Sequence, residues 1–445
     1  MTHRASLAFL TILGLITAIL LFIYVTITSF AVRAKDSHRR LSNVFETNQT
    51  QIWTPPDIKW VPLGSEMYGE EVGDTSGHIV AMSSDGSTIA VGARWNNGTG
   101  VTSGHVRVYK LNETDWVPLG SDIEGEASMD SSGWSIAMSS DGNTLVVGAP
   151  YNNGNAELSG HVRVYRFNGT DWAQIGADID GEELGDRSGW SVAMSSDGNT
   201  VAVGAPRNNG NGTNSGHARV YRFNDTGWAQ IGSDINGEAP GDRSGESIAM
   251  SSNGNMVAIG ASSNGGNGIW SGHVRVYMFN GTAWAQLGSD IDGRESWDQF
   301  GESVAMSSDG NILAIGTSLN SRSGHVRIYS FSGTDWTQVG SAIGGEELSD
   351  FSGGAVAMSS NGTTLIIGTP WNSGNGFESG QVRIYRFYET DWAEVRPALD
   401  GAASGDWFGY SVAMSSDGCI VAVGAPHKKD NGLWSGSVKV YKLQS

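Results

Sequence analysis

The chain has 445 residues with 63 glycines, 16 tryptophans and only 10 prolines, a composition that favours many short strands joined by tight turns. Its formal net charge of −19 would repel a phosphate backbone, so we expect no nucleic-acid partner. Cys419 is the only cysteine, which excludes an intrachain disulfide and a cysteine-based metal site. We expect Cys419 to be a buried strand residue.

The first element in chain order is an uncharged stretch of 28 residues, residues 5–32. It is long enough to cross a hydrocarbon core, which needs about 20 apolar residues. A cleaved signal peptide is the alternative, with small residues around position 31, but an h-region has only about 7–15 residues. We therefore assign residues 1–32 as an uncleaved signal-anchor transmembrane segment and residues 33–59 as a flexible stalk.

Two features of the sequence disagree about the side of the membrane on which the rest of the chain lies. Arg33, Lys35, Arg39 and Arg40 follow the segment, whereas only Arg4 and the amino terminus precede it, which favours a cytoplasmic carboxyl-terminal side. Eight Asn-x-Ser/Thr sequons favour an extracellular or lumenal side, which we prefer, although Asn-Gly is also a common hairpin turn. The candidate glycosylation sites are Asn48, Asn97, Asn112, Asn168, Asn211, Asn224, Asn280 and Asn361.

Residues 60–445 consist of seven copies of one repeat. The motif Ala-Met-Ser-Ser recurs with its methionine at positions 82, 138, 194, 250, 306, 358 and 414, spaced by 56 or 52 residues. A tryptophan and a tyrosine recur with the same count, which is typical of a closed ring of repeats. In the third copy the pattern predicts four strands, at residues 191–195, 201–205, 217–221 and 228–231, with two-residue turns such as Asp197-Gly198. The sequence therefore predicts an all-β fold, a seven-bladed β-propeller.

The two ends of the repeat region indicate how the ring closes. The last copy stops after its third strand, at Tyr441, and has no tryptophan strand, whereas the repeat region begins with an unpartnered one at Trp60. We predict that this N-terminal strand completes the last blade. Such a seam would tie both ends into the ring and remove two free sheet edges.

Two short motifs in each copy resemble those of a known repeat. Each first strand is preceded by Asp-x-[Ser/Phe]-Gly, as at residues 406–409, and each second strand ends in a form of Gly-Ala-Pro, as at residues 424–426. From about Trp60 to Tyr441 the chain thus resembles the FG-GAP repeat of propellers in integrin α-subunit heads and related surface proteins. The resemblance implies a propeller that acts in recognition or cell adhesion.

A calcium site of that family is not matched here. Integrin-like propellers often carry a DxDxDG loop between the first two strands, whereas the corresponding residues 195–199 hold one carboxylate, Asp197. We interpret the acidic segment at residues 178–186 as a solvated loop. We therefore expect no metal and no cofactor.

Positions that recur in all copies are interpreted as scaffold. An aspartate precedes every first strand, and we expect its carboxylate to accept loop N–H groups. The His and Arg of the third strand, such as His161 and Arg163, recur in most copies, so we expect them to pack between blades rather than act as a catalytic pair. The aspartates are Asp74, Asp130, Asp186, Asp242, Asp298, Asp350 and Asp406.

Positions that vary between copies are interpreted as free for recognition. One follows the loop glycine before the first strand and should rim the central channel; the other lies just after the second strand, in a loop on the same face. Aromatic rings and two carboxylates there suit stacking on sugars or anchoring a protein, and the alternative is that the rings only cover the blade cores. The predicted ligand-binding residues are His78, Trp134, Trp190, Glu246, Glu302, Tyr410, Trp95, Tyr151 and Trp371.

These observations favour a single-pass membrane protein that displays an extracellular or lumenal propeller for binding a protein or a glycan. We expect no enzymatic activity. Two alternatives stay open. Glu246 and Glu302 could be the acid/base pair of a glycoside-processing enzyme, in which carboxylate separation decides the mechanism. The chain could also be a surface-coat protein without a defined ligand.

Overall fold

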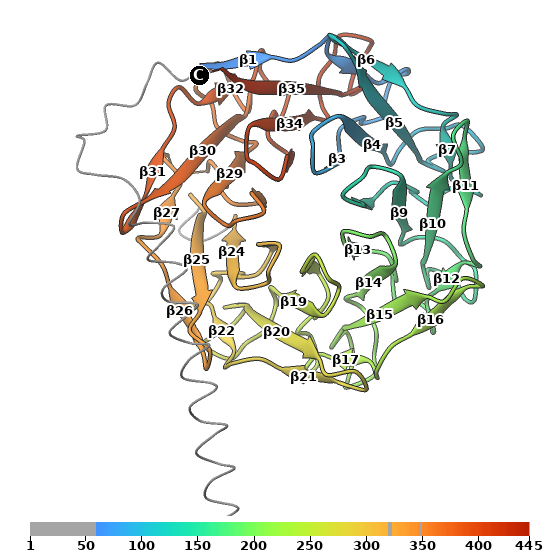
Figure 1. The fold of residues 1–445 in the computed structure, drawn as a ribbon, viewed down its shortest axis with the longest axis vertical. Helices are drawn as coiled ribbons and strands as arrows, with labels where there is room; N and C mark the ends of the chain where they lie inside the picture. Colours follow the sequence, from blue (N-terminus) through green and yellow to red (C-terminus); the bar gives the residue numbers. More distant parts are fainter. Residues whose placement is uncertain (1–58, 319–322, 348, 445) are drawn as a thin grey trace, which may run out of the picture. The chain divides into compact units, whose positions relative to one another are not determined.

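The computed structural model describes residues 59–318, 323–347 and 349–444. In this part of the chain, seven five-stranded antiparallel sheets are arranged as blades around one axis (Figure 1). The predicted seven-bladed β-propeller is therefore confirmed. The proposed transmembrane segment and all of the stalk except Lys59 lie outside the described residues, and no helix among the described residues is long and apolar enough to span a bilayer.

The strands follow the same order in every blade, from the axis outward. The first strands are β3 (Ile79–Met82), β8 (Ser135–Met138), β13 (Ser191–Met194), β18 (Ser247–Met250), β23 (Ser303–Met306), β28 (Ala355–Met358) and β33 (Ser411–Met414). The second strands are β4 (Thr88–Ala93), β9 (Thr144–Ala149), β14 (Thr200–Ala205), β19 (Met256–Ala261), β24 (Ile312–Thr317), β29 (Thr364–Thr369) and β34 (Ile420–Ala425). The third strands are β5 (His105–Asn112), β10 (His161–Phe167), β15 (His217–Phe223), β20 (His273–Phe279), β25 (His325–Phe331), β30 (Gln381–Tyr388) and β35 (Ser437–Gln444).

Two outer strands in each blade both pair with the third strand. The fourth strands are β6 (Asp115–Pro118), β11 (Trp172–Gln174), β16 (Trp228–Gln230), β21 (Trp284–Gln286), β26 (Trp336–Gln338), β31 (Asp391–Glu394) and, in blade 7, β1 (Lys59–Pro62). The fifth strands are β7 (Ile123–Glu124), β12 (Ile179–Asp180), β17 (Ile235–Asn236), β22 (Ile291–Asp292), β27 (Ile343–Gly344), β32 (Leu399–Asp400) and, in blade 7, β2 (Met67–Tyr68). The fifth strand was not predicted, because two residues carry no periodicity.

The hairpin loops include residues on both sides of the predicted Asp-Gly turns. Between β13 and β14 the loop comprises residues 195–199 rather than two residues, because the Ser195 Oγ donates to Asp197 (2.6 Å) and Asp197 accepts the Asn199 N–H (3.0 Å). Cys419 lies in the equivalent loop of blade 7 and is half-buried, so its placement in a strand was wrong. The side-chain hydrogen bonds of Asp197 thus decide the loop length, which the dipeptide signal did not reveal.

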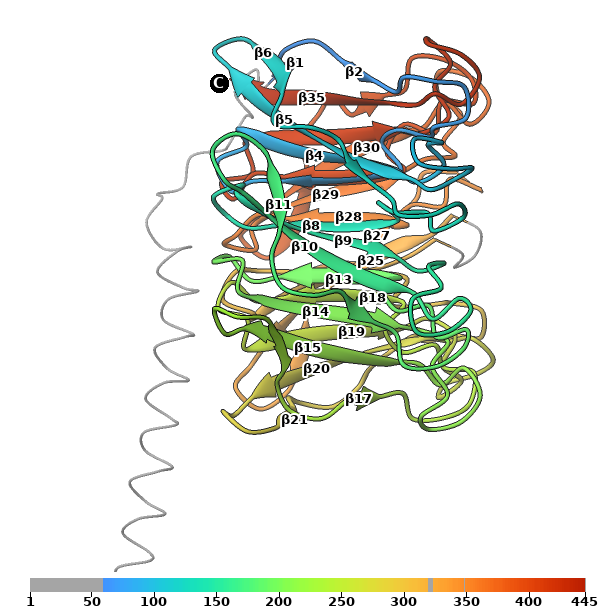
Figure 2. The ribbon, with the colours of Figure 1, turned by 90° about the vertical axis from the view of Figure 1, so that its right-hand side faces the viewer.

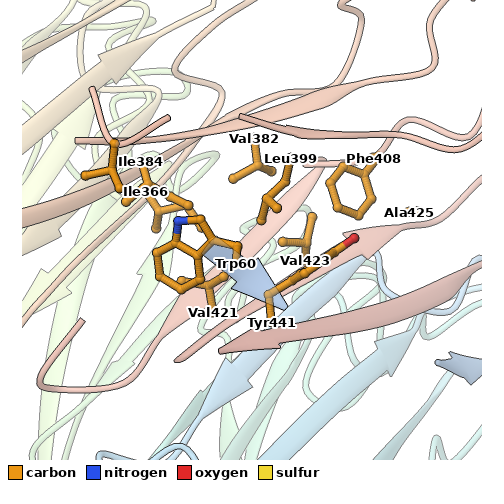
Figure 3. Close-up of a cluster of buried hydrophobic side chains, with 11 residues drawn as sticks. Trp60, Ile366, Val382, Ile384, Leu399, Phe408, Val421, Val423, Ala425 and Tyr441 are labelled. Atoms are coloured by element: carbon orange, nitrogen blue, oxygen red, sulfur yellow. The ribbon is translucent and has the colours of Figure 1, made fainter. Parts of the chain in front are cut away.

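The ring closes at blade 7 as predicted. Strand β1 pairs with β35 in the register Trp60↔Leu443 and Pro62↔Tyr441. The Trp60 side chain is 8% exposed and packs among buried residues that include Val421 and Ile384, as Figure 3 shows. The first strand of the repeat region therefore supplies core to the last blade, which couples the two ends of the propeller.

The two glycines of the repeat motifs face each other across neighbouring blades. A Cβ on Gly204, at the end of β14, would lie closer than 3.0 Å to the carbonyl oxygen of Gly245 in the loop before β18. The same close approach joins Gly148 to Gly189, and Gly424 to Gly77 at the seam. The motif glycines are therefore required because they set the distance between blades.

A closed ring of backbone hydrogen bonds joins the blades at the turns between first and second strands. The second serine of each Ala-Met-Ser-Ser motif donates its N–H to the carbonyl of the corresponding serine in the next blade, at 2.8–2.9 Å. The last serine donates back to the first, so the ring has no open end. Its members are Ser84, Ser140, Ser196, Ser252, Ser308, Ser360 and Ser416.

The recurring aspartate caps the loop before each first strand, as predicted. Asp242 accepts the N–H groups of Glu238 (3.1 Å) and Ala239 (2.8 Å), and in each of the other six blades the equivalent aspartate also accepts at least one loop N–H. Asp186 additionally accepts from the Asn208 side chain (3.1 Å). The aspartate therefore links two loops and has a structural role.

The His and Arg row of the third strands lies between blades, as predicted. Arg219 donates to the carbonyl of Asp180 in the preceding blade (2.8 Å), and Arg163 bridges Asp178 and Glu126. The His217 side chain is 1% exposed, and its Nδ1 lies 3.8 Å from an Asp234 oxygen. These side chains therefore belong to an interface between neighbouring blades that repeats around the ring and is largely shielded from solvent.

Acid is expected to destabilise the ring through this row. The pKa of His217 is lowered to about 4, first by burial and then by the charge of Arg219, while Asp234 opposes the shift. The pKa of His273 and His325 is also lowered to about 4, with burial as the main cause. Since an unfolded His has a pKa near 6.5, the unfolded chain binds more protons below that pH, and stability should fall between pH 6.5 and 4.

Urea unfolding from pH 8 to 4 measures this loss of stability. His217→Gln, which copies the residue present at position 381 in blade 6, should reduce the pH dependence. An unchanged pH profile in this variant would contradict the assignment to buried histidines.

Candidate recognition surface

The residues just before the first strands converge around the propeller axis. The His78 ring lies 5.1 Å from Tyr410 and 5.4 Å from Trp134, and the Trp134 and Trp190 ring centroids are 4.5 Å apart. These four residues, here called the axial cluster, come from blades 1, 2, 3 and 7. The structure therefore brings together side chains that are far apart in the sequence.

The loops after the second strands join the same surface, as predicted. The Tyr151 ring packs edge-on against Trp134 at 5.4 Å, and the Arg94 guanidinium lies between Trp95 (4.7 Å) and Trp134 (4.5 Å). Figure 2 shows that the strands run from one face of the propeller to the other. These loops lie on one face, and the hairpin turns between first and second strands lie on the opposite face. Among the other variable positions, Gly354 adds no ring and position 319 lies outside the described residues.

The predicted residues differ in how far they are accessible. Trp134, Trp190, Tyr410, Trp95, Tyr151 and Trp371 are half-buried, so they pack on one another and still offer part of each ring. His78 is 8% exposed. Its pKa is well below the usual value because of burial first and then the charges of Arg94 and His427. His78 is therefore a neutral ring that packs against its neighbours, and little of it is accessible to a ligand.

One set of loop residues, some of which reach this surface, was missed by the sequence analysis. The variable residue of Asp-x-[Ser/Phe]-Gly has φ between 50° and 58° in all seven blades. Trp407 occupies this position in blade 7, where its ring stacks on His427 (3.6 Å) and Tyr410 (5.9 Å). The residue type at this position varies between the seven copies, and this variation could have identified it as a recognition position. The left-handed backbone is unfavourable for bulky residues, so only the surrounding loops explain its presence. The set is Thr75, Ser131, Arg187, Arg243, Gln299, Phe351 and Trp407.

The two predicted carboxylates are held by serines from the loops after the second strands. Glu246 accepts from the Ser262 hydroxyl (2.5 Å), and Glu302 accepts from both the hydroxyl (2.5 Å) and the N–H (2.9 Å) of Ser318. The pKa of Glu302 is raised, mainly by burial, with a further contribution from Glu246 that the Ser318 hydrogen bonds oppose. The two glutamates are therefore electrostatically coupled.

Among the described residues, four groups of one histidine and two carboxylates have ligand atoms within 4.8 Å of one another, as in His217 with Glu182 and Asp234. They lie in the interblade row of blades 1 to 4. In each group an arginine already pairs with a carboxylate, as Arg219 does with Glu182 (3.3 Å). A cation would have to compete with this guanidinium, so interblade ion pairing accounts for the groups.

The sequon asparagines within the described residues are all exposed, and Asn48 lies outside them. Asn168 uses its Oδ1 to accept from Thr170 and the Asp171 N–H. Asn211 instead donates its Nδ2 to the carbonyls of Gly237 (2.9 Å) and Glu238 (3.0 Å). A glycan on Nδ2 is therefore compatible with the turn at Asn168, whereas it would disturb the loop contact at Asn211.

The architecture and the interblade glycines define a class, single-chain propellers whose blades are joined through repeated Asp-x-[Ser/Phe]-Gly and Gly-Ala-Pro-like motifs. The family model described as FG-GAP repeat matches residues 124–165, 175–221 and 398–441. The first two matches begin in or beside the outer strands of one blade and end in the third strand of the next, so this repeat unit crosses the blade boundary. These matches, together with the seven-bladed structure, support an FG-GAP propeller family for the chain. A search of curated proteins finds no match.

Proposed function

We propose that the chain is a recognition or adhesion module that binds a protein or a glycan through the surface around the axial cluster. The FG-GAP propeller fold is compatible with such a module. One observation carries the proposal: aromatic rings that differ from blade to blade meet in one partly exposed surface, whereas the residues that build the ring recur. Such rings suit stacking on sugars or anchoring a protein, and no catalytic role is needed to explain them.

Binding to a glycan array and to candidate surface proteins tests this function. Trp134→Ala and Trp190→Ala should each weaken binding by at least about tenfold, because both remove part of the shared ring surface. Trp270→Ala is the matched control, since Trp270 is 43% exposed and its one ring partner within the described residues is Trp297. Unchanged binding in both axial variants would contradict the proposed surface.

We also propose that residues 5–32 anchor the chain in a membrane and that the propeller is extracellular or lumenal. Exposure of the seven described sequons supports this topology. Digestion of the cell-expressed protein with a glycosidase should increase its mobility, and glycopeptide analysis should find Asn168 more occupied than Asn211. The absence of any mobility shift would contradict the exported topology.

A second candidate function is glycoside processing by Glu246 and Glu302. The observation that favours it is the raised pKa of Glu302 beside a second carboxylate, since a general acid must stay protonated near its working pH. Hydrolysis of an oligosaccharide that disappears in Glu302→Gln would support it. Lack of hydrolysis of any bound glycan would exclude it and leave recognition.

A further inference from the structure

Four arginines lie in the same loops as the predicted recognition residues. Arg187 and Arg243 precede the first strands of blades 3 and 4, and Arg94 and Arg207 follow the second strands of blades 1 and 3. Within the described residues no carboxylate forms a salt bridge with any of the four, whereas Arg107 and Arg163 in the interblade row each pair with two. The Nε atoms of Arg94 and Arg187 are buried, and neither has a hydrogen-bond partner in the part of the chain that the structure describes.

The loops that carry Arg207 and Arg187 touch, because the Arg207 N–H donates to the carbonyl of Asp186 (3.3 Å). The pKa of Arg207 is lowered first by burial and then by the charges of Arg187 and Arg243, with Tyr151 and Glu246 opposing. Glu246 is itself held by the Ser262 hydroxyl. The chain has a net charge of −19, but these arginines form a local cluster of positive charges. The repulsion among them costs free energy, which a bound anion would offset.

The arginines alternate with aromatic rings. Arg187 lies over Tyr151 (4.3 Å) and Trp190 (6.0 Å), Tyr151 packs against Trp134, and Trp134 lies under Arg94. Stacking on rings fixes the plane of a guanidinium and leaves its other N–H groups available to a planar anion. The surface thus combines donors for an anion with flat faces for a ring.

We propose that this arginine and aromatic cluster binds an acidic saccharide. Its carboxylate or sulfate would be held by Arg187, Arg207 and Arg243, while a sugar ring stacks on Trp134, Tyr151 or Trp190. This inference rests on the proposed function and names its ligand class. A nucleic acid fits poorly because it carries a charge on every nucleotide and extends over the acidic remainder of the chain, whereas a single carboxylate or sulfate needs only the local arginines. An acidic peptide has no comparable flat ring to stack.

The test measures binding of the full-length protein, purified in mild detergent, to three oligosaccharides of equal length, one carrying uronic acids, one sulfated and one neutral. We expect an acidic oligosaccharide to bind best, more weakly at high salt, and at least tenfold more weakly to Arg187→Gln. Preference between the two acidic probes identifies the anion. Arg187→Lys should restore only part of the affinity, because lysine lacks the planar fork.

Arg166→Gln is the matched control. It makes the same charge change near the carboxyl end of β10, where Arg166 hydrogen-bonds to Thr144 and Asn199, and it should leave affinity unchanged. An equal loss in this variant would overturn the inference by showing non-specific attraction. If the neutral saccharide binds and its binding is lost in Trp134→Ala but not in Arg187→Gln, the inference is overturned and the proposed function stands. Binding of none of the three would also overturn it, and loss of protein binding in Trp134→Ala would then still support the proposed function.

Discussion

The substitution Gly204→Ala is expected to lower the free energy of unfolding by about 3 kcal/mol, although it adds a single methyl group. That methyl would lie closer than 3.0 Å to the Gly245 carbonyl oxygen and to the Ser191 hydroxyl. Neither atom can move freely, because the Ser191 hydroxyl donates to that same carbonyl (2.8 Å) and both belong to the contact between blades 3 and 4. The added atom must therefore push two blades apart.

Gly227→Ala is the control for this prediction. A Cβ at Gly227 has no atom within 4 Å, so this alanine should change stability by less than about 1 kcal/mol and in the stabilising direction. Urea denaturation of both variants measures the difference. Equal stability of the two would show that the motif glycines do not set the blade spacing.

Trp60→Ala should have the other large effect, a loss of about 3–5 kcal/mol. The side chain is 8% exposed within the core shared by blades 6 and 7, and its Nε1 has no hydrogen-bond partner among the described residues, so the loss would report packing alone. Since β1 also pairs with β35, amide hydrogen exchange in β35 should rise more than in β15.

Trp270→Ala is the control for the seam. Its side chain is 43% exposed, and its removal should cost less than about 1 kcal/mol. If Trp60→Ala cost no more than this control, the N-terminal strand would not be needed to close the ring.

Much of the fold could be predicted because every blade repeats the same local requirements. The aspartate before each first strand, the tryptophan strand and the missing strand after Tyr441 gave the blade count and the seam, which the structure confirms. The turn around Asp197 and the position of Cys419 could not be predicted in the same way. They depend on side-chain hydrogen bonds that no alternation of apolar residues encodes.

The candidate surface was predicted in part, from positions at which the copies differ. That reasoning found Trp134 and Trp190, whose rings meet at 4.5 Å, but it passed over Arg187 and Trp407. A left-handed backbone at a bulky residue has no local signal, because neighbouring loops rather than intrinsic preference stabilise it.

By itself, then, the sequence determined the repeat, the seven blades and the strand that closes them, since these follow from short-range patterns present in each copy. Only the tertiary structure decided which variable residues meet. Arg94 and Arg187 are 93 positions apart, yet Trp134 and Tyr151 connect them in one surface because three successive blades bring their loops to the same axis. This proximity arises from the arrangement of the blades around the axis, which the sequence of a single repeat does not specify.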